Sequence, residues 1–218
     1  MTGIVCLQGG GELSPGCRDM DLALLARAPG PVAVAALASP PGEPYRRTCS
    51  HGVSWFRRLG ADAFAVPDPR EAAIGGALEG VALVVLPGGS PRTLMAALEE
   101  TGFGRQVVDH VAAGGAVMGA SAGAMALGEW TVLPDDRFRV VPGLALAPGI
   151  AVVPHWDGPR ADWLKTLDRE VDNGLVIGIP EESGILLQKG RLTGLGQRPS
   201  RLVREDREVG VGRTIRRP

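Results

Sequence analysis

The chain has 218 residues, of which 44% are apolar and 22% charged, and its formal net charge is −1. The length and composition are those of a globular α/β domain with its own core, and the balanced charge argues against a nucleic-acid partner. No apolar stretch approaches the roughly 20 residues of a membrane-spanning helix, so we expect no membrane partner.

The first half of the chain alternates short apolar runs with helical patterns. Its N-terminal run has no basic region and no cleavage site, so we predict a strand there and not a signal peptide. Apolar runs bounded by Gly, Pro or Asp predict buried parallel strands at Ile4–Leu7, Val32–Ala38, Ala63–Val66, Val81–Leu86 and Ala116–Gly119. The segments between them predict helices at Asp19–Ala28, Tyr45–Leu59, Arg70–Glu79, Pro91–Glu99 and Phe103–Ala113. This alternation predicts βαβ crossovers and a three-layer sandwich, a mostly parallel sheet with helices on both faces.

The pattern changes after residue 130. Short links separate predicted strands at Arg139–Leu146, Ile150–Pro154, Leu175–Ile179, Ile185–Gln188 and Arg191–Leu195, and one helix, Ala161–Val171, interrupts them. We expect this half to add an antiparallel portion at the edge of the sheet, with a hairpin turn at residues 188–191. The charged tail from Ser200 predicts a final edge strand and a frayed end. No linker or repeat is evident, so we expect one domain over residues 1–218.

A serine stands between a predicted strand and a predicted helix in Gly119-Ala120-Ser121-Ala122-Gly123. The motif is G-x-S-x-G, and its strand–turn–helix context is what a nucleophile elbow requires. The tight turn admits only small flanking residues and raises the serine Oγ above the carboxyl edge of the sheet. We therefore predict Ser121 as a nucleophile and the Ala122 N–H as an oxyanion donor. The alternative is an idle serine in a glycine-rich turn.

A second glycine-rich loop, Leu86-Pro87-Gly88-Gly89-Ser90, also follows a predicted strand and precedes a predicted helix. Glycines at the carboxyl end of a strand let backbone N–H groups approach a ligand closely. Sites in open α/β sheets form at this edge. Gly88 and Gly89 are therefore candidates for the second oxyanion donor, and the alternative is a plain turn.

A serine nucleophile needs a base within hydrogen-bond reach, and the chain has three histidines. His110 ends the helix that leads back to strand 116–119, which places it at the opposite end of the sheet from Ser121. His51 lies inside a predicted helix. His155 follows the apolar run Ile150–Pro154 at the end of a strand, where catalytic residues collect. We predict His155 as the general base.

The base in turn needs a carboxylate that fixes its tautomer. Two candidates follow a strand, one lies two residues from the histidine, and two lie in a preceding loop: Glu181, Glu182, Asp157, Asp135 and Asp136. The residues alone leave these alternatives open.

Four blocks of the chain together resemble the dipeptidase E and cyanophycinase family of serine peptidases. They are Pro87-Gly88-Gly89, Gly119–Ala124, Pro154-His155-Trp156-Asp157 and Gly178-Ile179-Pro180-Glu181-Glu182, and the opening Gly9-Gly10-Gly11-Glu12 is similar as well. The blocks keep the family's order from residue 4 to about 195. Each block alone is weak, but the combination is specific.

The resemblance implies a fold like that of the class I glutamine amidotransferases. It also implies a Ser-His-Glu triad, which maps to Ser121, His155 and Glu181 and so favours Glu181 over the other carboxylates. Serine at position 121 argues against glutaminase chemistry, because the amidotransferases use a thiolate.

The loop at 88–92 departs from the resemblance. Family members commonly have Gly-Gly-Asn-Thr there, whereas this chain has Gly-Gly-Ser-Pro-Arg, which puts strict specificity for an acidic first residue in question. Ser90, Arg92, Trp156 and Asp157 are the candidate substrate-binding residues. Arg92 could hold a carboxylate through its guanidinium fork, or it could face solvent. Trp156 adjoins the predicted base, or it could serve packing.

We therefore expect a serine peptidase that hydrolyses short peptides, dipeptides among them, through an acyl-enzyme. The alternatives are an esterase or isopeptidase with the same triad, and a non-catalytic binding or regulatory protein that retains the elbow. No metal or organic cofactor is expected, and a homodimer is the candidate assembly. The three cysteines, Cys6, Cys17 and Cys49, are an odd number without metal spacing, which fits a reducing compartment and predicts a cytoplasmic protein.

Overall fold

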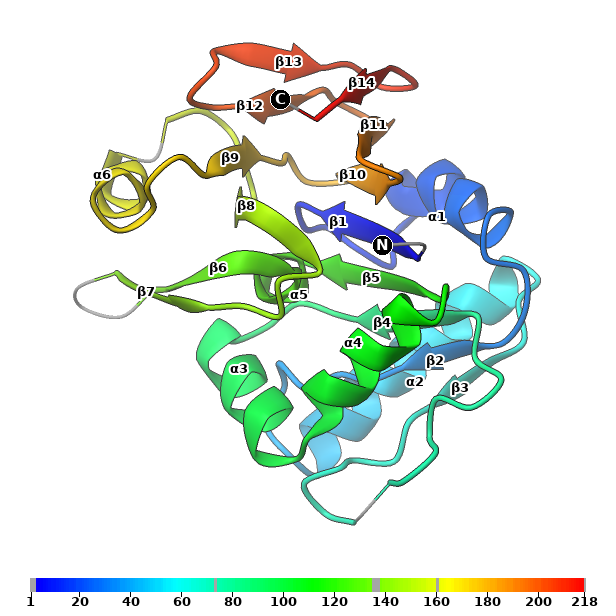
Figure 1. Ribbon diagram of the computed structural model, residues 1–218. Helices are drawn as coiled ribbons and strands as arrows, with labels where there is room; N and C mark the ends of the chain where they lie inside the picture. The colour runs from blue at the N-terminus through cyan, green and yellow to red at the C-terminus, as the bar shows by residue number, and fades with distance from the viewer. Residues whose placement is uncertain (1–2, 73, 135–137, 160, 218) are drawn as a thin grey trace.

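The computed structural model describes residues 3–72, 74–134, 138–159 and 161–217. It is a mixed α/β structure with two sheets and helices against them (Figure 1). None of the helices in these ranges is long and apolar enough to cross a membrane.

The larger sheet has eight strands in the order β14-β11-β10-β1-β5-β4-β2-β3. Its parallel part contains β1 (Ile4–Gln8), β2 (Val32–Val34), β3 (Ala63–Ala65), β4 (Leu83–Leu86) and β5 (Ala116–Ala120). Its antiparallel part contains β10 (Ser183–Gln188), β11 (Arg191–Gly196) and β14 (Thr214–Arg216). The predicted antiparallel extension is thus present, on the β1 side, and the predicted hairpin joins β10 to β11. Parallel β1, β4 and β5 end at one edge of the sheet, which brings together the loops that follow them.

The second sheet has six strands in the order β13-β12-β9-β8-β6-β7. Its strands are β6 (Gly128–Leu133), β7 (Arg139–Pro142), β8 (Ala147–Val153), β9 (Leu175–Gly178), β12 (Ser200–Leu202) and β13 (Arg207–Val209). The sequence predicted a single sheet that included β7, β8 and β9, and it did not predict β6 as a strand. The separation places the carboxyl ends of β8 and β9 beside the first sheet: the Gly9 carbonyl after β1 accepts the His155 N–H at 2.8 Å.

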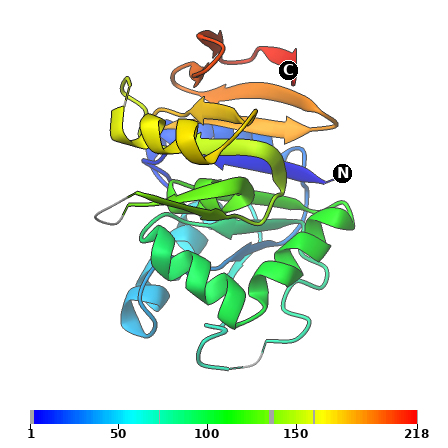
Figure 2. The ribbon, with the colours of Figure 1, turned by 60° about the vertical axis from the view of Figure 1, so that its left-hand side comes forward.

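Helices lie on both sides of the larger sheet (Figures 1 and 2). They are α1 (Arg18–Leu25), α2 (Glu43–Arg58), α3 (Pro91–Glu100), α4 (Phe103–Ala112) and α5 (Ala122–Leu127), and a short 3-10 turn at Pro15–Cys17 precedes α1. Helix α6 (Ala161–Glu170) precedes β9 of the second sheet. Helix α2 contacts β2 and β3, whereas α3 contacts α4 and α5.

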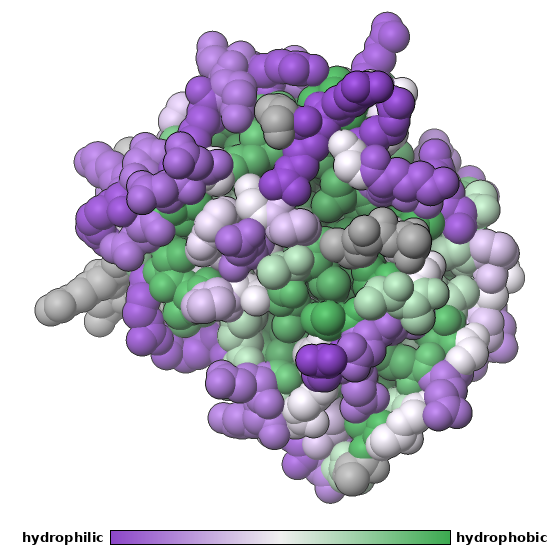
Figure 3. All heavy atoms as spheres, in the orientation of Figure 1, coloured by the Kyte–Doolittle hydropathy of each residue, from purple (hydrophilic) through white to green (hydrophobic). Residues whose placement is uncertain are grey.

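Buried apolar side chains from both sheets form one connected core. In the view of Figure 3, hydrophilic residues gather around the rim, and apolar residues show across the middle of the face. Among the described residues, Phe64 and Val211 are the large apolar side chains that are exposed. All three cysteines are buried and unpaired, and burial raises their thiol pKa values.

The predicted helix at Arg70–Glu79 is wrong, because its described residues form turns. Gly76 within this segment and Gly80 directly after it adopt φ of +72° and +70°, outside the helical region. Arg70, at the start of the segment, lies in a turn and forms a buried ion pair with Asp68. The predicted strand at 32–38 ends at Val34, where the chain turns into the loop before α2.

Candidate active site

Ser121 lies at the junction of β5 and α5. Its φ of 49° and ψ of −109° are unusual for a residue with a side chain, which is the strain expected of a nucleophile elbow. The turn leaves no room for larger neighbours: a Cβ atom on Gly119 would lie 2.4 Å from Gly123 C, and one on Gly123 would lie 2.1 Å from Leu86 O. The Ser121 N–H donates to the Gln8 carbonyl at 3.0 Å, which ties the elbow to β1.

His155 follows β8 and reaches the serine. Its Nε2 is 2.8 Å from Ser121 Oγ. The residue has φ of 51°, and its N–H donates to the Gly9 carbonyl at 2.8 Å. Gly10 lies against the imidazole, since a Cβ atom there would be 2.3 Å from Cε1. The glycine-rich loop after β1 therefore fixes both the backbone and the ring of His155.

Glu181 lies on the other side of the ring. Its Oε1 is 3.0 Å from His155 Nδ1, and both side chains are partly open to solvent. Glu182 is held elsewhere: it accepts a hydrogen bond from Ser14 Oγ at 3.0 Å, and its carboxylate lies against Gly16. Asp157 is exposed after β8. Asp135 and Asp136 are outside the described residues.

The backbone N–H groups predicted to hold the oxyanion, at residues 88, 89 and 122, lie in different surroundings. The Gly88 N–H donates to Glu12 Oε1 at 2.7 Å. Gly89 adopts φ of +142°, and a Cβ atom there would be 2.7 Å from the Ala38 carbonyl oxygen. The first bond of α5 runs from the Met125 N–H to the Ser121 carbonyl, so the Ala122 N–H is one of the groups that the helix ladder does not use.

Three of the four predicted substrate-binding residues line two separate hollows, and Ser90 lines neither. Ser90 caps α3, because its Oγ accepts from the Thr93 N–H at 3.2 Å. Arg92 lines a hollow between α3, α4 and the β6–β7 hairpin. Trp156 and Asp157 line another hollow with Pro180, and Trp156 and Pro180 adjoin His155 and Glu181 in the chain. The Trp156 ring also packs on Gly178, where a Cβ atom would be 2.3 Å from it.

The other two histidines lie away from the serine. His110 Nε2 is 3.1 Å from the Ala116 carbonyl oxygen at the start of β5, as the topology predicted. Partial burial lowers its pKa. His51 is on the exposed side of α2.

A buried polar cluster under the elbow was not predicted. Asp21 of α1 is fully buried and accepts hydrogen bonds from Gln8 Nε2 at 2.7 Å and Trp55 Nε1 at 2.8 Å. Burial raises the pKa of Asp21 to about 6, although both hydrogen bonds oppose the shift. Among the described residues, Gln8 Oε1 has no hydrogen-bond partner. Gln8 also supplies the carbonyl that anchors Ser121, so this cluster supports the elbow.

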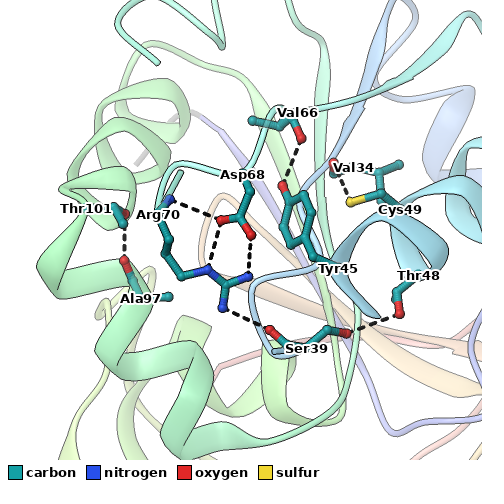
Figure 4. Close-up of polar contacts among 10 residues, drawn as sticks. All are labelled: Val34, Ser39, Tyr45, Thr48, Cys49, Val66, Asp68, Arg70, Ala97 and Thr101. Carbon is teal, nitrogen blue, oxygen red and sulfur yellow. Dashed lines mark hydrogen bonds and ion pairs between the residues drawn. The ribbon is translucent and has the colours of Figure 1, made fainter. Parts of the chain in front are cut away.

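A second polar cluster joins residues of the loops after β2 and β3 (Figure 4). Arg70 pairs with Asp68 through two bonds of 2.8 Å and donates from Nη1 to the Ser39 carbonyl at 2.9 Å. The neighbouring Ala38 carbonyl accepts the Ser90 N–H at 3.0 Å. The Arg70–Asp68 pair thus holds the loop after β3 against the loop after β2, and the Ser90 hydrogen bond ties the loop after β2 to the loop after β4.

Within the described ranges, no group of His, Cys, Asp and Glu is arranged to hold a metal ion. The arrangement at the sheet edge is instead a hydroxyl, an imidazole and a carboxylate, each within hydrogen-bond distance of the next. In such a series the imidazole can take the hydroxyl proton, and the carboxylate can stabilise the resulting imidazolium.

Comparison with known proteins shows where the same fold occurs. The chain is similar over 99% of its length to a peptidase from an acI-B1 Actinobacterium, with 97% of that chain covered, a TM-score of 0.80 and 21% identity. A candidate peptidase E protein from Listeria monocytogenes EGD-e matches 90% of this chain and 100% of its own, with a TM-score of 0.65 and 15% identity. At these identities the two structures show a shared fold. No curated protein matches the sequence.

Peptidase family S51 matches residues 49–195, which is more than half of the chain and includes the serine, the histidine and the glutamate. The resemblance drawn from the sequence blocks is therefore confirmed at the level of the family. The chain belongs to peptidase family S51.

Proposed function

We propose that the protein is a serine peptidase that hydrolyses short peptides, including dipeptides, with Ser121 as nucleophile, His155 as general base and Glu181 as the carboxylate that orients it. The observation that carries the proposal is the continuous series from Ser121 Oγ to His155 Nε2, 2.8 Å, and from His155 Nδ1 to Glu181 Oε1, 3.0 Å. Membership of a peptidase family supports the choice of a peptide bond as the substrate.

In the proposed reaction, His155 Nε2 takes the proton of Ser121 as Oγ attacks the peptide carbonyl carbon. Glu181 holds the proton on Nδ1 and stabilises the imidazolium. His155 then gives the proton to the leaving amine as the C–N bond breaks. A water molecule attacks the acyl-enzyme with His155 again as base, which releases the acid and restores Ser121.

The tetrahedral intermediates need donors for their negative oxygen. The Ala122 N–H is next to the nucleophile and is not used by the helix. The Gly88 N–H is the second donor in this proposal, and it becomes available when the Glu12 carboxylate leaves it. Loss of one such donor typically costs about a hundredfold or more in turnover.

The test combines a covalent probe with a peptide panel. A fluorophosphonate should label the wild type at Ser121, and peptide mapping should show no label in Ser121→Ala. Dipeptides with Asp, Glu, Leu and Arg as first residue are then offered to both proteins. Cleavage that is lost in Ser121→Ala is the expected result. Labelling without cleavage of any peptide would overturn the peptidase proposal and favour an ester or isopeptide substrate, and absence of labelling would favour a non-catalytic protein.

A further inference from the structure

The Glu12 carboxylate occupies the backbone donor that the proposed reaction requires. Its Oε1 accepts the Gly88 N–H at 2.7 Å. A Cβ atom built on Gly88 would lie 2.8 Å from Glu12 Oε1 and 3.1 Å from Ser121 Cβ. The Glu12 carboxylate and the nucleophile therefore both lie next to Gly88. A substrate carbonyl oxygen that takes the Gly88 N–H as its donor has to replace the Glu12 carboxylate there.

The backbone that carries Glu12 is tightly held. The carbonyls of Gly9 and Gly10 accept the N–H groups of His155 and Glu182, each at 2.8 Å, and the Gly11 carbonyl accepts from Cys17 Sγ at 3.3 Å. Glu12 itself is half-buried. Its backbone is therefore positioned relative to His155, and the carboxylate can move only by rotation of its own side chain.

Charge and hydrogen bonding leave Glu12 suited to a cation. In the described part of the chain, its carboxylate has no ion pair, and its hydrogen bond to Gly88 uses Oε1. The two nearby carboxylates of the site, Glu181 and Glu182, are already committed to His155 and Ser14. A carboxylate in a partly buried position gains most from a charged donor.

The chemistry of a peptide supplies such a donor at the required place. In a substrate whose first residue forms the acyl group, the α-ammonium nitrogen is about 2.5 Å from the carbonyl carbon, as bond lengths and angles dictate. When that carbon lies at Ser121, the ammonium lies within reach of the carboxylate that occupies the neighbouring Gly88 N–H. An ammonium that attracts Glu12 also frees the Gly88 N–H for the oxyanion.

We infer that Glu12 is the specificity residue of the site, which binds the α-ammonium group of the substrate's first residue and in doing so releases the Gly88 N–H. This inference rests on the proposed function. Under this inference Glu12 distinguishes peptides with a free amino terminus from acylated peptides. Acylated peptides leave Glu12 on Gly88 and the oxyanion site closed.

The test uses boronic acids, which add to a serine hydroxyl and do not depend on the choice of peptide. Ser121 Oγ forms a bond to boron, its proton passes to His155, and the boronate becomes tetrahedral. The probes are 1-amino-3-methylbutylboronic acid and its N-acetyl derivative. Their Kd values are measured by calorimetry for wild type, Glu12→Gln and a control, Glu100→Gln, which removes one charge from the exposed end of α3.

Glu12→Gln keeps an oxygen that can accept the Gly88 N–H, so the fold should be retained, and a melting curve checks it. We expect the wild type and Glu100→Gln to prefer the free amine over the acetylated probe. In Glu12→Gln this preference, the ratio of the two Kd values, should fall about tenfold to a hundredfold, the range for losing a hydrogen bond between charged groups.

A preference that survives in Glu12→Gln, or a wild type without any preference, would overturn the role of Glu12. Failure of both boronates to form an adduct at Ser121 in the wild type is a different result. It would remove the proposed function itself, and the inference with it.

Discussion

Gly10 lies so close to the imidazole of His155 that a Cβ atom would be 2.3 Å from Cε1 and 2.6 Å from Nδ1. Gly10 also adopts φ of +127°, a conformation that residues with a side chain rarely take. The glycine is therefore needed for the position of the proposed base as well as for the turn.

Gly10→Ala should move the ring away from Ser121 or from Glu181. A displacement of about 1 Å in a catalytic group can lower the rate about a hundredfold, so we expect a loss of at least that size in kcat/KM. The measurement is hydrolysis of the best dipeptide from the panel, together with the rate of fluorophosphonate labelling. Gly75→Ala is the control, because a Cβ atom there meets nothing within 4 Å. Wild-type rates in Gly10→Ala would show that the ring does not need this space.

Glu181 and Glu182 are adjacent, and they should differ in function. Glu181→Gln removes the charge that faces Nδ1 at 3.0 Å and allows the wrong tautomer of His155, so we expect kcat to fall about 10²- to 10⁴-fold. Glu182→Gln should retain hydrolysis, since Ser14 can still donate to an amide oxygen. Steady-state kinetics on both variants checks this. If Glu182→Gln were the more damaging of the two, the orienting carboxylate would have to be reassigned.

The sequence predicts those parts of the site that depend on residues close together in the chain. The elbow is visible because the strand, the small residues and the helix around Ser121 are contiguous. His155 was found because it ends a strand. The choice of Glu181 over Glu182 as the carboxylate beside His155 rests on the family resemblance. Two adjacent glutamates after a strand do not indicate by themselves which one turns toward the histidine.

The parts that sequence does not predict depend on distant pairs. Glu12 meets Gly88 across 76 positions of the chain, and Asp21 meets Trp55 across 34. The second sheet was missed for a similar reason: apolar strands after residue 130 look alike whichever sheet they join, and only tertiary packing decides it. The helix predicted at 70–79 does not form, because Gly76 adopts φ of +72° there.

Burial of Asp21 should make stability depend on pH. Its pKa is raised from 3.8 to about 6, so between these values the folded chain binds more protons than the unfolded chain. Stability therefore falls as pH rises from about 4 to about 6 and stays lower above it. Two units of pKa correspond to about 3 kcal/mol, as an order of magnitude.

Asp21→Asn should remove this dependence. The asparagine oxygen can accept from Trp55, and its amide can donate to Gln8 Oε1, which lacks a partner in the wild type, once the Gln8 amide rotates. Urea unfolding of both proteins between pH 4 and 8 measures the effect. We expect the free energy of unfolding of the variant, relative to that of the wild type, to increase as pH rises. A constant difference across this range would mean that the pKa of Asp21 is the same in the folded and the unfolded chain.

The Arg70–Asp68 ion pair should matter for stability and for the site. The two side chains are only 14% and 2% exposed, and Arg70 also lies over the Tyr45 ring at 5.4 Å. Arg70→Ala leaves the Asp68 carboxylate buried without its cation, and breaking such a pair typically costs about 3–5 kcal/mol. It also removes the bond to the Ser39 carbonyl, so the Gly88-Gly89 loop should loosen and kcat should fall.

Arg105→Ala is the matched control, because Arg105 forms an ion pair with Asp109 whose side chains are 79% and 60% exposed. Exposed pairs contribute about 0–1 kcal/mol, so urea unfolding should separate the two variants clearly. The double variant Asp68→Asn with Arg70→Ala removes the unpaired charge as well, and should recover much of the lost stability. It should not recover kcat, since the Ser39 contact remains absent. Equal losses of unfolding free energy in Arg70→Ala and Arg105→Ala would mean that the buried pair stabilises the fold no more than the exposed pair does.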